Sequence, residues 1–163
     1  MRVESVLLVL VAAFGAAGCT EPPEASQAPG GTWLPSIGPE RDAAIERQFR
    51  GFDMAMVETG YRFSELYWAG LDQNWAYATY QAEKIGTAIQ NGLERRPARA
   101  ASARPFLEAA LPMLQGAIET RDPGAFAVSF EGLMAACNSC HAAERMEFVQ
   151  VTVPTLRAVP VGG

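Results

Sequence analysis

Apolar residues recur at helical spacing through most of the chain that follows Pro39. Steps of three, four and seven residues place them on one face of successive helices, and strand-like alternation begins only at Phe148. The four stripes are Ile45, Phe49, Phe52, Met56 and Phe63; Trp75, Ala78, Ala82, Ile85 and Ile89; Phe106, Leu107, Leu111, Leu114 and Ile118; and Phe126, Phe130, Leu133, Cys137 and His141. Four such helices bury their stripes most simply by packing together. The expected fold class is all-α: an antiparallel four-helix bundle over residues 40–147, with an extended tail over residues 148–163.

Proline, glycine and capping residues set the expected limits of the first two helices. The first begins just after Pro39 and runs as far as Trp68, with Gly60 as a candidate for a bend or an early end. Asp72 is a candidate N-cap for the second helix, which ends near Gly92.

The second half of the chain carries equally clear limits. Residues 95–99 form a basic, proline-interrupted stretch that reads as a solvated loop. Pro105 opens a third helix, which is broken or kinked at Pro112. Asp122 followed by Pro123 predicts the start of the fourth helix, because a capping side chain precedes a proline at the first helical position.

The N-terminus has the layout of a secretory signal. Residues 1–18 contain one early cation and an apolar stretch of 13 residues, Val6–Gly18, whereas a helix that spans a bilayer needs about 20. The stretch ends Ala16-Ala17-Gly18-Cys19, which resembles an imperfect bacterial lipobox and predicts lipidation of Cys19. The alternative is an ordinary secretory cleavage at the same bond, with Cys19 as a chance thiol.

Residues 19–39 are predicted to form a tether. They hold five of the 11 prolines and a Gly-Gly pair, a composition that neither propagates a helix nor supplies a core. With a lipid on Cys19, this tether would hold the helical domain beside a bacterial membrane, in the periplasm or outside the cell.

The charge balance narrows the choice of partners. The chain has 13 Lys and Arg against 18 Asp and Glu, a net charge of -5, so it offers no basic surface of the kind that holds a phosphate backbone. Nucleic acid is therefore not an expected partner. At 163 residues the chain also has room for only one domain of ordinary size.

The chemistry is concentrated in one pentapeptide, Cys137-Asn138-Ser139-Cys140-His141. The Cys-x-x-Cys-His spacing is typical of covalent attachment of a c-type haem. On a helix, the two thiols and the imidazole emerge from one face. The thiols of Cys137 and Cys140 can then join the two vinyl groups of one haem while His141 reaches the iron as proximal ligand.

Three other interpretations of the pentapeptide were weighed. A structural zinc site needs four ligands, and the chain offers no second pair beside this one. A thioredoxin-like dithiol would follow a strand and begin a helix, whereas this pair lies late in a helical pattern. An inert disulfide between the two cysteines in an oxidising compartment stays open.

The second axial ligand of the iron is less constrained. Because His141 is the only histidine, a monomer cannot ligate the iron through two imidazoles. The candidates are a methionine thioether, water, another side chain, or nothing. Of Met54, Met56, Met113, Met134 and Met146, we favour Met56, because it lies on the apolar stripe of the first helix whereas Met54 is rotated off it. Packing alone is the competing role for this methionine.

With its haem motif on the last long helix, the chain resembles the class II c-type cytochromes, the cytochrome c prime group. Residues 40–141 carry the resemblance, through Leu66-Tyr67-Trp68-Ala69-Gly70, Asn74-Trp75-Ala76-Tyr77-Ala78 and the haem motif. It implies a four-helix bundle whose first helix covers the distal side of the haem, where Met56 lies. Some members place methionine on the iron and carry electrons, and others leave the site open and bind nitric oxide or carbon monoxide. Homodimerisation, as in the prime group, is an open alternative.

The leading functional expectation is a single-haem electron carrier that exchanges electrons with redox partner proteins. The alternative is a five-coordinate protein that binds or senses nitric oxide or carbon monoxide. Enzymatic activity is not expected, because peroxidase-like chemistry needs a distal acid or base and there is no second histidine. Arg62, Lys84 and Arg145 are candidates to pair with the haem propionates.

Overall fold

The computed structural model describes residues 34–157, and this part of the chain is helical with no strand. Its helices are α1 (Pro39–Phe49), α2 (Phe52–Leu71), α3 (Trp75–Arg95), α4 (Ala100–Pro105), α5 (Leu111–Thr120) and α6 (Pro123–Ala143), with a 3-10 turn at Pro97–Arg99 and a π-helical turn at Phe106–Ala110. The all-α prediction is confirmed. The predicted signal (residues 1–18), Cys19 and most of the tether lie outside the described residues.

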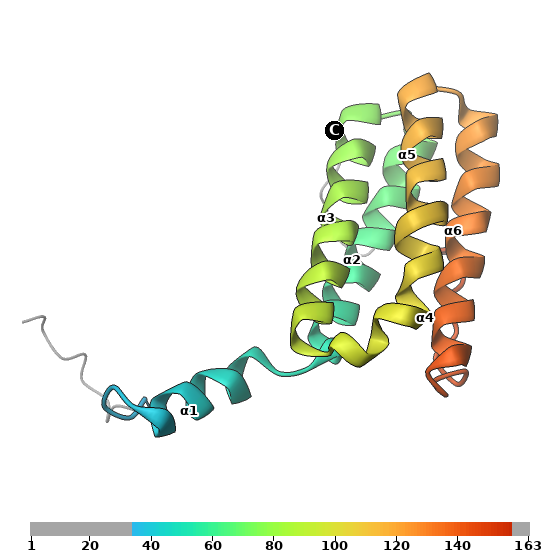
Figure 1. The fold of residues 1–163 in the computed structure, drawn as a ribbon. Coiled ribbons are helices and arrows are strands. Elements are labelled where there is room, and N and C mark those ends of the chain that lie inside the picture. The colour runs from blue at the N-terminus through green and yellow to red at the C-terminus, as the bar shows by residue number, and fades with distance from the viewer. Residues whose placement is uncertain (1–33, 158–163) are drawn as a thin grey trace, which may run out of the picture. The chain divides into compact units, whose positions relative to one another are not determined.

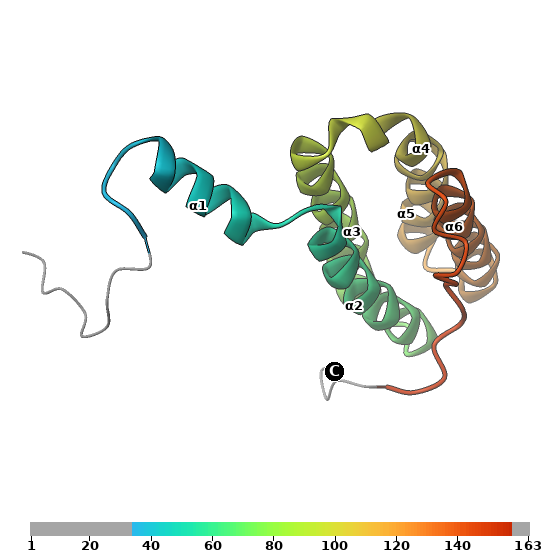
Figure 2. The same cartoon turned by 90° about the horizontal axis from the view of Figure 1, so that it is seen from below.

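The helices α2, α3, α5 and α6 lie side by side (Figures 1 and 2). α2 packs against α3 and α6, and α5 packs against the same two helices. Between them lies a core of large apolar side chains, of which Leu66, Ile85, Leu114 and Leu133 are completely buried. The predicted stripes supply most of this core.

The first expected helix is in fact two helices, and this boundary was predicted wrongly. The break falls at Arg50 and Gly51 instead of Gly60, which lies inside α2. Arg50 has a positive φ of 58° with ψ of -157°, a backbone conformation that side chains other than glycine rarely adopt. The backbone N–H of Gly51 then donates to Asp53 Oδ1 at 3.0 Å, which starts α2. Phe49 is consequently 62% exposed and does not join the core.

The cap of the next helix was also assigned to the wrong residue. Asn74 caps α3, because its Oδ1 accepts from the backbone N–H of Tyr77 at 3.2 Å. Asp72 instead ends α2 and forms an ion pair with Arg157 of the tail. α3 continues to Arg95, beyond the expected end at Gly92.

The third helical stretch begins earlier than predicted and is interrupted by a wider turn. It starts at Ala100, with Pro105 as the last residue of α4. Pro105 and Pro112 both lack a backbone N–H, and the five residues at Phe106–Ala110 between them wind as a π-helix. The start of α6 agrees with the prediction: Asp122 Oδ1 accepts from the N–H groups of Gly124 and Ala125 at 2.7 and 3.0 Å.

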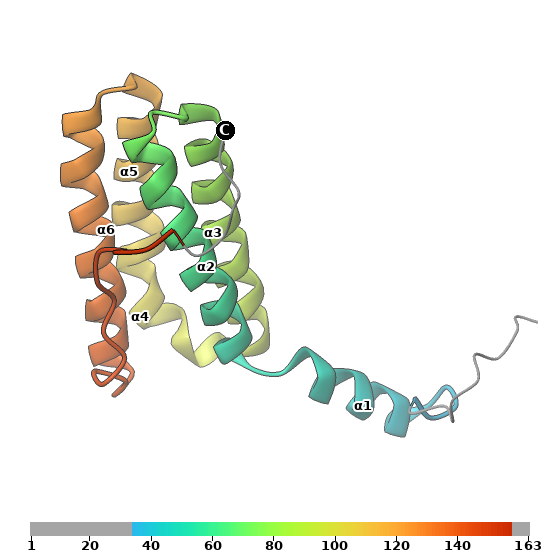
Figure 3. The ribbon, with the colours of Figure 1, turned by 180° about the vertical axis from the view of Figure 1, so that it is seen from behind.

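The tail after α6 turns back along the helices. Figure 3 shows it leaving the end of α6 and passing across to α2. Residues 148–157 contain no helix or strand, and residues 158–163 of the predicted extended tail lie outside the described residues.

Candidate haem site

A cavity of about 650 Å³ lies where α2 begins and α6 ends. This volume falls within the range of roughly 300–1,000 Å³ that is usual for small-molecule and cofactor sites. Most of its wall is apolar, with Phe52, Val57, Phe63, Ile89 and Phe106 among the lining residues. Such a wall suits a largely apolar ligand.

The four candidate haem-binding residues all line this one cavity. Cys137, Cys140 and His141 reach it from the last two turns of α6, and Met56 reaches it from the second turn of α2. Each of these four side chains is half-buried. The start of α2 and the end of α6 are far apart in the sequence, and both line the cavity that the thiols and the imidazole of the pentapeptide reach.

Met56 differs in its surroundings from the other methionines. It packs against the core and lines the cavity, whereas Met54 is 37% exposed and lines no part of it. Met113 is 68% exposed, and Met134 packs on the core away from the cavity. Met146 also lines the cavity, but it follows α6 on the side of His141.

The two thiols are free, and burial keeps them protonated. Burial, reinforced by the neighbouring Cys140 sulfur, raises the pKa of the Cys137 thiol from 9.0 to about 12. Burial also raises the pKa of Cys140. Unlike redox-active dithiols, which lower a cysteine pKa to generate thiolate, this site has no such activation.

The imidazole of His141 is oriented by the tail. Its Nδ1 lies 2.8 Å from the backbone carbonyl oxygen of Val149. Since a carbonyl only accepts, Nδ1 carries the hydrogen and Nε2 is the nitrogen that is left for a metal. Metal-ligating histidines usually donate their second ring N–H in this way.

Two arginines that the sequence assigned to a solvated loop also line the cavity. They are Arg96, which precedes the 3-10 turn, and Arg99, which is its last residue. Arg99 lies over the ring of Phe52, 5.3 Å from its centroid, and its Nε is 3.5 Å from Glu144 Oε2. Guanidinium groups at a cavity suit a ligand that carries carboxylates.

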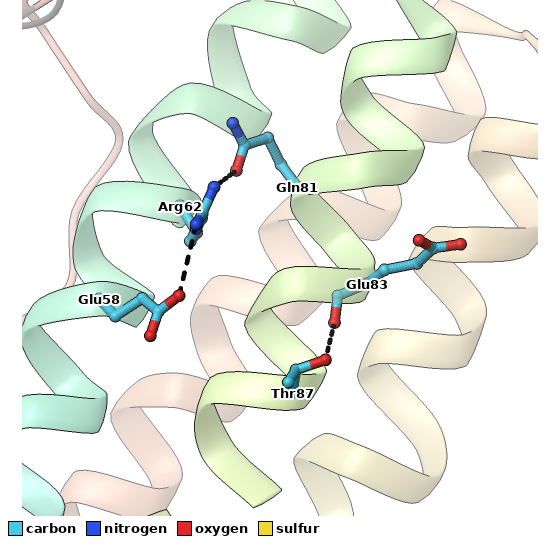
Figure 4. Close-up of polar contacts among 5 residues, drawn as sticks. All are labelled: Glu58, Arg62, Gln81, Glu83 and Thr87. Atoms are coloured by element: carbon cyan, nitrogen blue, oxygen red, sulfur yellow. Dashed lines mark hydrogen bonds and ion pairs between the residues drawn. The ribbon is translucent and has the colours of Figure 1, made fainter. Parts of the chain in front are cut away.

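The three cations predicted to face propionates do not line this cavity. Arg62 lies between α2 and α3, where it donates to Gln81 Oε1 at 3.2 Å and to Glu58 Oε1 at 3.4 Å (Figure 4). Figure 4 also shows the Thr87 hydroxyl, which donates within α3 to the backbone oxygen of Glu83, four residues earlier. Lys84 lies over the ring of Tyr80, and Arg145 is exposed beyond α6. The sequence contains no pattern that indicates Arg96 and Arg99, instead of these three cations, as the residues that line the cavity.

One polar side chain in the cavity wall lacks a protein partner. The Thr59 hydroxyl oxygen is buried and forms no hydrogen bond with any of residues 34–157, although Thr59 lines the cavity one turn after Met56.

Within residues 34–157, no cluster of three or more His, Cys, Asp or Glu side chains could hold a metal ion, so the zinc alternative has no ligand set there. None of the helices described is long and apolar enough to cross a membrane.

The chain matches no protein-family model, no curated protein sequence and no solved structure.

Proposed function

We propose that this protein is a mono-haem c-type cytochrome that carries electrons. Cys137 and Cys140 would hold the haem through two thioether bonds, with His141 as the proximal ligand and Met56 as the distal ligand. The observation that carries the proposal is that one apolar cavity is lined at once by both thiols, the imidazole and the thioether. The bound iron would supply a one-electron redox centre.

Each wall of the cavity has a part in this proposal. The apolar side chains exclude water from the ring, and a methionine on the iron raises its reduction potential. Arg96 and Arg99 replace the earlier candidates as partners for the haem carboxylates. The packing of α2, α3, α5 and α6 is proposed to be the antiparallel four-helix bundle of a class II-like cytochrome.

The cellular setting follows from the N-terminus. We propose that residues 1–18 export the chain and that a lipid on Cys19 anchors it to a bacterial membrane, with residues 19–39 as a tether. Haem c is assembled outside the cytoplasm, so export and the Cys-x-x-Cys-His motif support each other. The partners would be redox proteins in the periplasm, with nucleic acid excluded by the acidic charge balance.

The decisive experiment is expression in a bacterial host that attaches haem c. Intact mass spectrometry of the mature protein should show one haem per chain, retained after denaturation. Ser139→Ala, which changes the pentapeptide without touching a thiol, should retain haem, while Cys137→Ala with Cys140→Ala should lose it. Unmodified or mutually bridged cysteines in the wild-type protein would refute the proposal.

The second candidate function is binding of nitric oxide or carbon monoxide at a five-coordinate iron. The observation that favours it is the Thr59 hydroxyl, a buried donor without a partner among residues 34–157 in the wall that also holds Met56. A high-spin ferrous spectrum with rapid uptake of carbon monoxide would select this function. A low-spin spectrum with the far-red sulfur-to-iron band would select electron transfer.

A further inference from the structure

The middle residues of the pentapeptide are not equivalent. The Ser139 side chain is exposed and forms no hydrogen bond with residues 34–157, whereas the Asn138 amide binds the tail at two points. Its Nδ2 donates to the carbonyl oxygen of Val151 at 2.9 Å, and its Oδ1 accepts from the Val151 N–H at 2.8 Å. Asn138 thus satisfies both backbone groups of one tail residue, as a neighbouring strand would.

This contact is in register with the hydrogen bond to the imidazole. Asn138 and His141 are three residues apart on α6 and so lie on neighbouring turns of one face. Val151 and Val149 are two residues apart in the tail, and Val149 is the residue whose carbonyl accepts from His141 Nδ1. The Val149 N–H also donates to the Met146 carbonyl oxygen at 2.8 Å, so Val149 is held on one side by this turn and on the other by the contact between Val151 and Asn138.

The far end of the tail is held separately. Arg157 donates from both terminal nitrogens to the carboxylate of Asp72, at 2.7 and 2.9 Å, and lies over the ring of Trp68. Both charged partners are exposed to solvent, which screens this pair, so it contributes little to stability. It limits where the tail runs without contacting the imidazole.

We propose that Asn138 is a positioning residue for the proximal ligand. By holding Val151, it places the Val149 carbonyl against His141, which selects the Nδ1–H tautomer, directs Nε2 into the cavity and makes the imidazole a more basic ligand. The effect on the iron rests on the proposed function, whereas the effect on the tautomer does not.

The tautomer is tested first, on the full mature chain without haem. At pH 8.5, above the ordinary histidine pKa of about 6.5, side-chain ¹⁵N NMR of His141 reports which nitrogen carries the hydrogen. We expect the Nδ1–H form in the wild-type protein, a shift toward Nε2–H in Asn138→Ala, and no change in the matched control Ser139→Ala. A wild-type tautomer population in Asn138→Ala overturns the proposal.

The route through the tail is tested by a double-mutant cycle. Val151→Pro removes the N–H that donates to Asn138 and should shift the tautomer in the same direction. If Asn138 acts through Val151, the double variant should shift no further than Asn138→Ala alone, whereas additive shifts would overturn this route. Asn138→Asp keeps the acceptor for the Val151 N–H and should give an intermediate shift, which decides the matter if the alanine variant fails to fold.

The holo-protein gives an independent readout. Loss of an imidazole hydrogen bond weakens the ligand for ferric iron more than for ferrous iron, so the reduction potential of Asn138→Ala should rise. A tenfold change in relative affinity, the lower end of the usual effect of such partners, corresponds to about 59 mV for one electron. The Ser139→Ala potential should stay at the wild-type value, and an unchanged Asn138→Ala potential would refute the effect on the iron. If the wild-type chain takes up no haem, the proposed function fails while the tautomer measurement still decides the role of Asn138.

Discussion

Replacing Met56 by leucine separates a methionine that ligates iron from one that only packs. Methionine and leucine have similar volumes, so even a buried exchange costs less than about 1.5 kcal/mol, and Met56 is only half-buried. We therefore expect a loss of about 1 kcal/mol or less, which lowers the Tm of a chain of this length by no more than about 2–4 °C. The ligand role predicts a much larger signature: complete loss of the far-red sulfur-to-iron band, a lower reduction potential, and binding of carbon monoxide to the ferrous form.

Two other methionines provide matched controls for this experiment. Met54 lies two residues away on the same helix and is exposed, and Met146 lines the cavity on the side of His141. Met54→Leu and Met146→Leu should both keep the far-red band and the wild-type potential. Persistence of the band in Met56→Leu, or its loss in Met146→Leu, would show that the distal ligand is assigned to the wrong residue.

Three further predictions concern the chain without haem. In a urea titration, Gly70→Ala should lower the free energy of unfolding by about 1–3 kcal/mol, because the added Cβ collides with the buried ring of Phe126. The control Gly132→Ala has open space around its Cβ and should raise this free energy by roughly 0.5–1 kcal/mol. Equal effects of the two variants would contradict the packing of α2 on α6. Thr59→Val removes a buried hydroxyl without a partner in the described part of the chain and should leave stability unchanged or raise it by up to about 1 kcal/mol, so a clear loss in the same titration would mean that the hydroxyl is hydrogen-bonded. Alkylation of Cys137 by iodoacetamide, followed by peptide mass spectrometry, should be slow at pH 8 and accelerate only toward its pKa of about 12, because the thiolate is the reactive form; a half-maximal rate near pH 9 would show that the thiol is not buried.

The pH dependence of stability follows with a definite sign from the same thiol. The folded chain holds the Cys137 proton up to a pKa of about 12, while the unfolded chain releases it near the ordinary value of 9.0. Between these values the folded state binds more protons than the unfolded state, so stability falls as pH rises. Urea midpoints should decline from pH 9 upward, and this decline should be reduced in Cys137→Ser, whose hydroxyl does not titrate in that range.

Sequence reasoning succeeded where a feature is contiguous or periodic. The start of α6 followed from Asp122 and Pro123 because the capping groups are local, and the buried faces followed from 3.6-residue spacing. Met56 was selected from the same spacing, and the structure brings it to the cavity that His141 lines. What those residues bind there stays a prediction.

The errors share a different physical cause. The break at Gly51 depends on the positive φ of Arg50 and on the Asp53 carboxylate, which accepts from the Gly51 N–H; no apolar pattern records either feature. Asp72 was taken for a cap because its charge suits one, yet it ends α2 and forms an ion pair with Arg157, 85 residues later. In both cases the limit of the helix depends on a particular side-chain contact. One of these contacts is local, and the other joins segments 85 residues apart.

The two sides of the candidate haem site differ in the same way. The proximal residues Cys137, Cys140 and His141 lie within one helical turn of each other, so their joint presentation needs only α6 to form. Met56, the proposed distal ligand, and the two arginines come from segments that the core must first bring to the end of α6. The cysteine motif would therefore remain recognisable in a chain whose helices packed differently, whereas the potential of a bound iron, its access to small ligands and the basicity of its histidine would all change with that packing. The tail follows the same logic, because Asn138 orients the imidazole only through residues that the chain places beyond the motif.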